Sequence, residues 1–444
     1  MHTRSVFAVL AAAAWLAPGA LVHAAPATAT PTDVPADSLA ADSTLSLAAL
    51  ERWVLERNPD LEAMRWALAA AGERSKMAGA LMDPELEFTV GPASFDEADL
   101  PAAYRIGVKQ MLPWAKLGPQ RSAARHEASA DSAGVAALRN QVLRLTRATY
   151  VEYWQGDASL RVVRELQGLI EEFRRVALSR YASGLVGEAD PLMAEAEQAR
   201  LEHDAITYTR LRDTARAQLN SLLHREGGAP LPAAPAGFPP PGSVPPLATL
   251  VGHAVRNRPE VAAAEARARA GQARLTLAGR QWLPDVEVMA AYDRFMMEEP
   301  YRPMVGVSVN LPLWFGRISA ARREAQAGVA EGVAATAGAR DRVAFEVQEA
   351  YARVLDSAHE AGIVRHAELP VNQRALGAAR AGYESGRNDF LTLLNAERDL
   401  TRARLAEIRV AAEYRMGLAD LEQAVGVALA GAFPETPANE EGTR

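Results

Sequence analysis

The sequence predicts a mainly helical protein with a small β part, built from one structural unit that is written twice. Two observations favour this class. Long stretches contain no residue that would break a helix, and two short strand-like segments interrupt them. These segments are DPELEFTV (83–90) and LPDVEVMA (283–290). Apolar and polar side chains alternate along both, which is the period of a β-strand.

Three further pairs of segments recur at nearly the same offset and indicate an internal duplication. RNPDLEA recurs as NRPEVAA, GVKQMLPW as GVSVNLPLW, and YASG as YESG. A period this long is typical of a duplicated half and not of a short-repeat array. Each half is expected to run helix, strand, strand, long helix, tight turn, helix. We therefore predict a first repeat at 45–225, a linker rich in proline and glycine at 226–246, and a second repeat at 247–430.

The two ends of the chain are predicted to lie outside the folded body. Residues 1–25 combine a basic start at Arg4, an apolar run and a site typical of signal-peptide cleavage, so a secretory signal peptide is expected. The apolar run is shorter than the ~20 residues that a membrane-spanning helix needs. Residues 26–44 are predicted to be a flexible segment and residues 431–444 a loose tail.

Composition and missing motifs exclude several classes of function. The 444 residues are 49% hydrophobic and 23% charged, which suits a sizeable folded body, and the net charge of −7 argues against a nucleic-acid partner. The absence of cysteine excludes disulfides, thiolate metal sites and a lipid anchor on an N-terminal cysteine. No phosphate-binding glycine loop, HExxH or GxSxG motif occurs. We predict that the protein is not an enzyme and needs no cofactor.

Two uninterrupted helical stretches, 119–181 and 317–383, are too long for an ordinary globular core. At 1.5 Å per residue each would extend about 100 Å. Apolar residues recur along them at steps of three and four, which predicts a coiled-coil-like seam. These residues are Val135, Leu138, Val142 and Leu145, then Val329, Val333, Val343 and Val347, the second set keeping this spacing when the intervening Thr336 and Arg340 are counted. A free-standing coiled-coil rod would explain these helices but not the strands.

The strand-like segments are apolar on one face and charged on the other, which is the pattern of transmembrane β-strands. The apolar faces are predicted to contact lipid, and a half-buried soluble sheet is the alternative. Four strands cannot close a barrel, because the smallest outer-membrane barrels have about eight, so copies must assemble. The predicted lumen residues are Glu85, Glu87, Lys109, Asp285, Glu287, Ser308 and Asn310. The predicted interfacial aromatic residues are Trp114, Trp314 and Phe315.

Over residues 45–426 the chain resembles the TolC family of outer-membrane efflux channels. The resemblance lies in the element order, the RNPDLEA/NRPEVAA pair, the LPW and LPLWFGR strand exits, and the turns YASGLVGEADPL and YESGRNDFLTLL. It implies a homotrimer with a twelve-stranded transmembrane β-barrel and a helical coiled-coil tunnel that crosses the periplasm of a Gram-negative bacterium. It also implies a passive duct in a tripartite efflux system, with a periplasmic adaptor protein and an inner-membrane pump as partners.

The segments LPLWFGR (311–317) and Pro370 are most similar to the family branch that serves heavy-metal cation pumps. A duct for drugs or for type I protein secretion stays open as an alternative, as does a periplasmic coiled-coil adaptor or scaffold. Pro370 is also expected to interrupt its long helix. Candidate metal ligands are few, and solvated histidines or methionine filler explain them as well. They are His359, His366, Met289, Met296, Met297 and Met304.

The two turns between long helices are predicted to form the periplasmic mouth that docks an adaptor. Glycine suits the left-handed position at each helix end, and Leu185 and Val186 are apolar residues that a turn by itself does not need. The predicted tip consists of Ser183, Gly184, Leu185, Val186, Gly187, Ser385, Gly386, Arg387 and Asn388. The resemblance further implies a constriction at Asp190, Thr392 and Asn395. The alternative is that Asp190 merely caps the returning helix.

Overall fold

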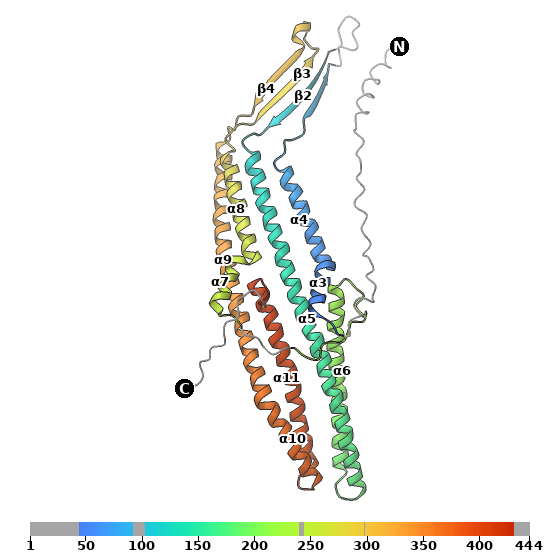
Figure 1. Cartoon of the computed structure of the whole chain (residues 1–444). Coiled ribbons are helices and arrows are strands. Elements are labelled where there is room, and N and C mark those ends of the chain that lie inside the picture. Colours follow the sequence, from blue (N-terminus) through green and yellow to red (C-terminus); the bar gives the residue numbers. More distant parts are fainter. Residues whose placement is uncertain (1–43, 92–102, 239–243, 297, 430–444) are drawn as a thin grey trace, which may run out of the picture. The chain divides into compact units, whose positions relative to one another are not determined.

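The computed structural model describes residues 44–91, 103–238, 244–296 and 298–429 (Figure 1). The predicted signal peptide, nearly all of the flexible segment and the predicted tail lie outside these residues. Within the described part, the chain is mainly helical with one small antiparallel sheet, as the sequence predicts.

The order of helices and strands repeats along the chain. The first series is α3 (Leu47–Arg57), α4 (Pro59–Met77), β1 (Glu85–Val90), β2 (Tyr104–Leu112), α5 (Leu117–Ala182) and α6 (Ala189–Leu222). The second is α7 (Leu247–Asn257), α8 (Pro259–Gly279), β3 (Val286–Asp293), η3 (Glu299–Tyr301), β4 (Pro303–Val309), α9 (Phe315–Ile363), η4 (Val364–Glu368), α10 (Leu369–Glu384) and α11 (Phe390–Val425). None of the helices in the described ranges is both long and apolar enough to cross a membrane.

The four strands form a single sheet in the order β1-β2-β3-β4, with each neighbouring pair antiparallel (Figure 1). The central pair joins the two halves of the chain, because β2 of the first series pairs with β3 of the second. In this register Leu86 lies opposite Val108, which in turn lies opposite Ala290. Since paired residues share a face, the apolar sets of all four strands fall on one side of the sheet.

Helix α5 contains no proline after its first turn, and a glycine follows both α5 and α10 in the turns that close the two hairpins. Helix α5 has 66 residues and corresponds closely to the predicted stretch. Gly184 and Gly386 adopt φ of 68° and 75°, a left-handed conformation that glycine adopts without strain. In both turns the amide after the glycine donates to a carbonyl five residues earlier, from Leu185 to Arg180 and from Arg387 to Gly382. Both hairpins therefore close with the same Schellman-type turn.

The second long helix is interrupted directly before Pro370. Helix α9 ends at Ile363, the π-helical segment η4 follows, and α10 begins with Pro370 in its first turn. Proline has no amide hydrogen to donate to the preceding turn, and π-helical segments are rare local insertions into α-helices. The interruption predicted at this proline thus takes the form of a single π-helical segment.

Two of the buried cores that hold the helices together can be followed through the described residues. One lies where the α5–α6 hairpin contacts α10 and α11, and the other contains side chains of α7, α8, α9 and α11. Of the predicted seam, Val142, Val343 and Val347 are buried, whereas Val333 remains 63% exposed. Part of the seam on α9 is therefore uncovered in the single chain.

The repeated motif before α4 and α8 fixes the same joint in both halves. Asn58 and Arg258 each precede a proline at the helix start and are both buried. The Asn58 amide donates to the Leu222 carbonyl (3.4 Å), and the Arg258 guanidinium donates to the Ala424 carbonyl (2.9 Å). Each side chain therefore ties a short helix to the end of the last helix of its own half.

The segment between α6 and α7 is anchored by one aromatic side chain. The Phe238 ring lies 4.7 Å from the Trp154 ring of α5, centroid to centroid, and the Arg415 guanidinium of α11 lies 5.1 Å from the Phe238 centroid. The connection predicted as a linker thus contacts both halves of the chain.

Candidate functional site

One face of the sheet carries charged side chains that pair across strands. Arg105 of β2 donates from Nε to the Asp293 carboxylate of β3 at 2.9 Å, and Lys109 forms an ion pair with Glu87 of β1. Ser308 of β4 donates to Glu287 at 3.1 Å. These residues fall on the face that the alternation predicts as polar.

Asp285 and Asn310, also predicted as lumen residues, lie just beyond the strand ends. Their backbones pair, and the Asn310 side-chain oxygen accepts from the Asp285 amide at 2.8 Å. The Asp285 carboxylate meets Lys116 at 2.6 Å, at the start of α5. They fasten the sheet to the first turn of the long helix.

The opposite face of the sheet is apolar and exposed. Val305 is 88% exposed, Leu86 74% and Val307 67%, although each stands in the middle or at the flank of a strand. Trp114, Trp314 and Phe315 are also exposed, at the junctions between strand and helix. A contiguous apolar surface of this kind requires a covering partner or lipid.

The hairpin turns expose one of the two apolar residues predicted for docking. Leu185 is 69% exposed, whereas Val186 is half-buried and Ser183, Gly184 and Gly187 are exposed. In the second turn Ser385, Gly386 and Arg387 are exposed and Asn388 is half-buried. The predicted tip therefore presents a single prominent apolar side chain, Leu185.

Asp190 does not cap the returning helix, so that alternative is wrong. The N-cap position of α6 is Glu188, and Asp190 lies within the first turn. In the second half the cap is Asp389, whose carboxylate accepts from the Thr392 amide at 2.9 Å. A carboxylate inside the first turn still interacts favourably with the helix dipole. For this reason an aspartate near a helix start resembles a cap in the sequence.

The Asp190 carboxyl instead faces the other hairpin. It lies beside Tyr383 and Arg180, and burial raises the pKa of the Asp190 carboxyl. The buried Tyr383 hydroxyl lies close to the Asp190 carboxyl, and this contact lowers the pKa of Asp190 less than burial raises it. Arg180 donates to the Tyr383 carbonyl (2.6 Å) and stacks over its ring (4.6 Å to the centroid). Arg180 thus links α5 to α10, a contact that periodicity could not predict.

Thr392 and Asn395, the other predicted constriction residues, are exposed on α11. They lie on a different side of the helix from the buried Leu393 and Leu394. The constriction at Asp190, Thr392 and Asn395 stays a prediction.

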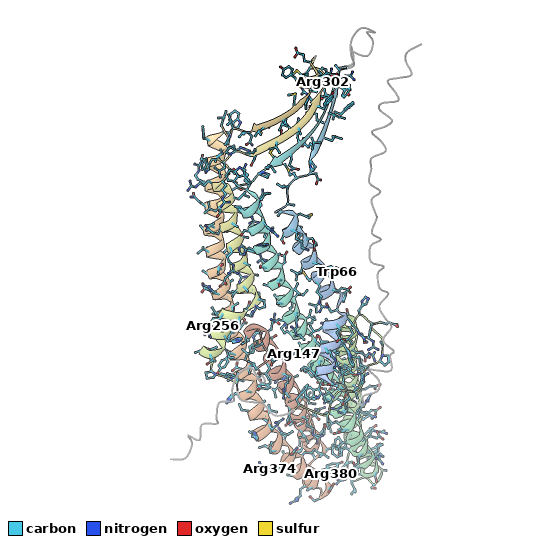
Figure 2. All side chains as sticks on the ribbon, turned by 45° about the horizontal axis from the view of Figure 1, so that its top comes forward. Trp66, Arg147, Arg256, Arg302, Arg374 and Arg380 are labelled. Carbon is cyan, nitrogen blue, oxygen red and sulfur yellow. The ribbon has the colours of Figure 1, made fainter. Side chains whose placement is uncertain are left out.

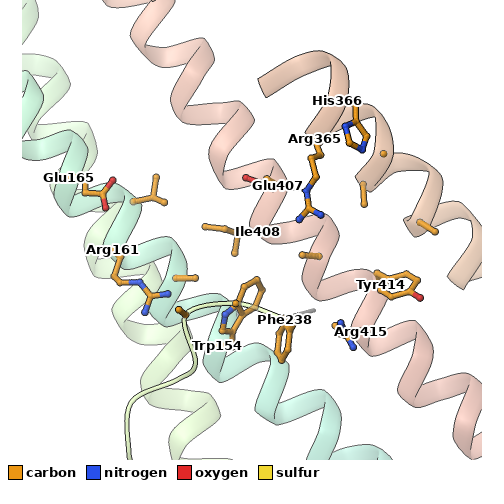
Figure 3. Close-up of a pocket in the computed structure, with 18 residues that line it drawn as sticks. Trp154, Arg161, Glu165, Phe238, Arg365, His366, Glu407, Ile408, Tyr414 and Arg415 are labelled. Carbon is orange, nitrogen blue, oxygen red and sulfur yellow. Dashed lines mark hydrogen bonds and ion pairs between the residues drawn. The ribbon is translucent and has the colours of Figure 1, made fainter. Parts of the chain in front are cut away.

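A cavity of about 500 Å³ lies between α5, the segment containing Phe238, η4 and α11 (Figure 3). Aromatic residues Trp154, Phe238 and Tyr414 line it, together with the Arg365–Glu407 ion pair (3.3 Å) and His366. Across the described ranges, no three histidine, aspartate or glutamate side chains gather closely enough to hold a metal.

Three of the methionines named as candidate soft ligands, Met289, Met296 and Met304, lie on or between β3 and β4. The Met289 side chain lies against Gly306 on the polar face, and Met296 is 43% exposed in the connection between β3 and β4. Met297 lies outside the described residues. We assign no metal ligand among these side chains or His359 and His366.

An open amphipathic sheet attached to helices of this length is the arrangement expected of an outer-membrane channel protein. Residues 250–427 match the outer membrane efflux protein family. The match covers the second repeat of the chain and shows that this part is similar to a family of outer-membrane efflux proteins.

Curated and solved relatives agree with this assignment. The cobalt-zinc-cadmium resistance protein CzcC of Cupriavidus metallidurans is 24% identical over 381 residues, covering 81% of this chain and 86% of that protein. A membrane protein from Pseudomonas aeruginosa superposes with a TM-score of 0.76 at 20% identity, covering 86% of this chain and 90% of its own. VceC of Vibrio cholerae has the same fold, with a TM-score of 0.72 and 20% identity, covering 86% of this chain and 96% of its own. CusC also has this fold, with a TM-score of 0.74 and 16% identity, covering 86% of this chain and 92% of its own.

Proposed function

We propose that the protein is the outer-membrane duct of a tripartite efflux system and works as a homotrimer. The observation that carries this proposal is the sheet, whose exposed apolar face lies back to back with a charged face. Strands β1 and β4 are its edges in the described chain. Open edges are not stable in hydrocarbon, so the sheet must close with strands of other copies. Three copies would supply twelve strands, well above the minimum of about eight.

The helices extend far beyond the membrane. Helix α5 alone, with 66 residues, is about 100 Å long, whereas the hydrocarbon core is about 30 Å thick. We infer that the helices cross the periplasm of a Gram-negative bacterium and that their hairpin turns meet a periplasmic adaptor, which connects them to an inner-membrane pump. CusC, which has the same fold, is described as forming a transmembrane channel.

Heavy-metal cations are the cargo that we infer. CzcC, a relative along most of its length, is named for cobalt, zinc and cadmium resistance. The polar strand face carries four carboxylates, Glu85, Glu87, Glu287 and Asp293, against the two basic groups Arg105 and Lys109, hence a net −2 per chain. A negative lining raises the local concentration of cations and favours their passage. A duct of this kind needs no catalytic residue and no cofactor.

The proposal is tested in two stages. Detergent-purified protein from the outer-membrane fraction should scatter light as a trimer and conduct ions in planar bilayers; a monomer that washes off membranes would instead favour the adaptor or scaffold alternative. Cells that lack the gene should then become more sensitive to zinc, cobalt or cadmium. If these cells became more sensitive to drugs but not to metals, the duct function would stand and drugs would be its cargo.

A further inference from the structure

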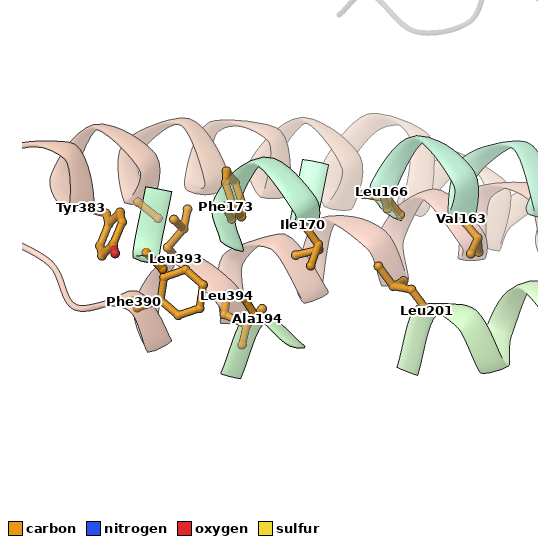
Figure 4. Close-up of a cluster of buried hydrophobic side chains, with 12 residues drawn as sticks. Val163, Leu166, Ile170, Phe173, Ala194, Leu201, Tyr383, Phe390, Leu393 and Leu394 are labelled. Carbon is orange, nitrogen blue, oxygen red and sulfur yellow. The ribbon is translucent and has the colours of Figure 1, made fainter. Parts of the chain in front are cut away.

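Two buried glutamates lie in the seam between the hairpins. Figure 4 shows apolar side chains of α5, α6, α10 and α11 meeting there, among them Leu201 of α6 and Leu394 of α11. Glu197 of α6 and Glu397 of α11 lie in this stretch, and neither has any exposed surface. Burying a carboxylate is costly unless it is paired or protonated.

Glu197 is fully paired and therefore charged. Arg200 of the same helix donates to it from Nε at 2.8 Å, and Arg398 of α11 donates from Nε at 2.7 Å. Burial alone would raise the pKa of Glu197, but these two guanidinium groups outweigh it and hold the pKa below its usual range. The Glu197–Arg398 pair is a direct ionic contact between the two hairpins.

Glu397 has no such counter-charge. Its Oε1 contacts the Thr401 hydroxyl at 2.6 Å, and its Oε2 is buried without a hydrogen-bond partner in the part of the chain that the structure describes. Burial raises the pKa of Glu397, and the nearby Glu197 carboxylate raises it further. When Glu397 is protonated, its hydroxyl can donate to Thr401, whose own hydrogen then reaches the Glu397 backbone carbonyl at 3.0 Å.

The charges around Glu397 balance only when it is neutral. Arg200 and Arg398 supply two positive charges, and Glu197 supplies one negative charge. Asp204, which pairs with Arg200 at 2.9 Å, supplies the second negative charge.

The other packed elements do not offer Glu397 a cation. Along this seam α5 contributes Glu165 and Glu172, which pair with Arg404 of α11 (3.4 Å) and Arg380 of α10 (3.1 Å). An ionised Glu397 would add an unpaired buried charge to this arrangement.

We propose that Glu397 is a buried proton-binding site that makes the contact between the two hairpins depend on pH. With its proton, Glu397 is neutral, so the α6–α11 seam contains no unpaired charge and stays closed. Without it, the carboxylate gains water only if α6 and α11 separate at this level. The pKa of Glu397 in the folded state is raised above its ordinary value of 4.5. The proton therefore stabilises the closed seam fully below pH 4.5, and this stabilisation is lost as the pH rises from 4.5 through the folded-state pKa.

The test uses purified protein and requires no transport, so its outcome does not depend on the proposed function. Amide hydrogen exchange of residues 192–205 and 393–405 is compared between wild type and Glu397→Gln, a neutral mimic of the protonated acid, at equal pH. At low pH the two should agree. As the pH rises, wild type should exchange faster, by up to about tenfold per pH unit between the ordinary and the raised pKa.

Glu407→Gln is the matched control, since Glu407 lies on the same helix but is partly exposed beside Arg365. Its exchange difference from wild type should not vary with pH. Infrared spectra recorded as the pH rises should contain a protonated-carboxyl band that persists above pH 4.5 and that Glu397→Gln lacks. If Glu397→Gln does not fold, Thr401→Val, which removes the partner of the protonated acid, should move the titration of this band. Equal exchange of wild type and Glu397→Gln at every pH, or the absence of such a band above pH 4.5, would overturn the proposal.

Discussion

An arginine on either side of one strand tests which face of the sheet meets lipid. Val307 is 67% exposed on the apolar face, opposite Val288, and the next residue, Ser308, lies on the polar face beside Glu287. Arginine on the lipid face of a membrane strand costs roughly 2–4 kcal/mol near mid-bilayer. We expect Val307→Arg to lower the folding equilibrium constant at least about 30-fold per chain. Three copies in a trimer would lose roughly 6–12 kcal/mol.

Ser308→Arg is the matched control at the same depth. Its guanidinium can reach Glu287 in an aqueous lumen, so folding should be nearly unchanged. Urea titration of vesicle-inserted protein, with the gel mobility of unheated trimers, measures both variants. Equal loss in the two variants would refute the assignment of faces. A reversed order would mean that β4 pairs one residue out of register, because such a slip exchanges the two faces of a strand.

The remaining predictions concern the tips and the repeated joint. Leu185→Asp with Val186→Asp should abolish export in resistance assays while trimers persist on gels, and unimpaired export would remove docking from this turn. Asn58→Ala removes a helix cap, so it should lower the free energy of unfolding by about 0.5–2 kcal/mol and with it the thermal midpoint. Asn58→Asp keeps the acceptor for the Leu61 amide and should lower the free energy of unfolding less. Asp190→Asn should raise bilayer conductance at low salt by weakening the contact with the other hairpin; unchanged conductance and cation preference would place the constriction elsewhere.

Much of the fold follows from local sequence signals. The 66-residue helix α5 is predictable because no glycine–proline signal stops it before Gly184, and the strands are predictable because their period of two is unambiguous. The π-helical segment before Pro370 was not predictable in form, because α- and π-helical turns differ little in residue pattern. The proline indicates a break but not its geometry.

The functional contacts were less predictable than the elements that carry them. The charged strand residues follow from alternation alone, and the structure places them on one face. Arg398 and Glu197, in contrast, are 201 residues apart, and no helical period tells which helix a buried carboxylate will meet. Asp190 was assigned by its position before proline, a signal that fits a cap and a first-turn residue equally well.

The ion pairs of Arg147 have a consequence for how the chain folds. Arg147, labelled in Figure 2, binds Glu51 of α3 and Glu422 of α11, which lies 275 residues further along the chain. In a chain that is exported from its N-terminus, α3 and α5 emerge long before α11. Contacts of such high sequence separation slow folding and leave apolar surface uncovered in the meantime. Truncation before α11 would therefore leave Arg147 without its Glu422 partner. We expect the growing polypeptide to need a chaperone that keeps it from aggregating until α11 has been made.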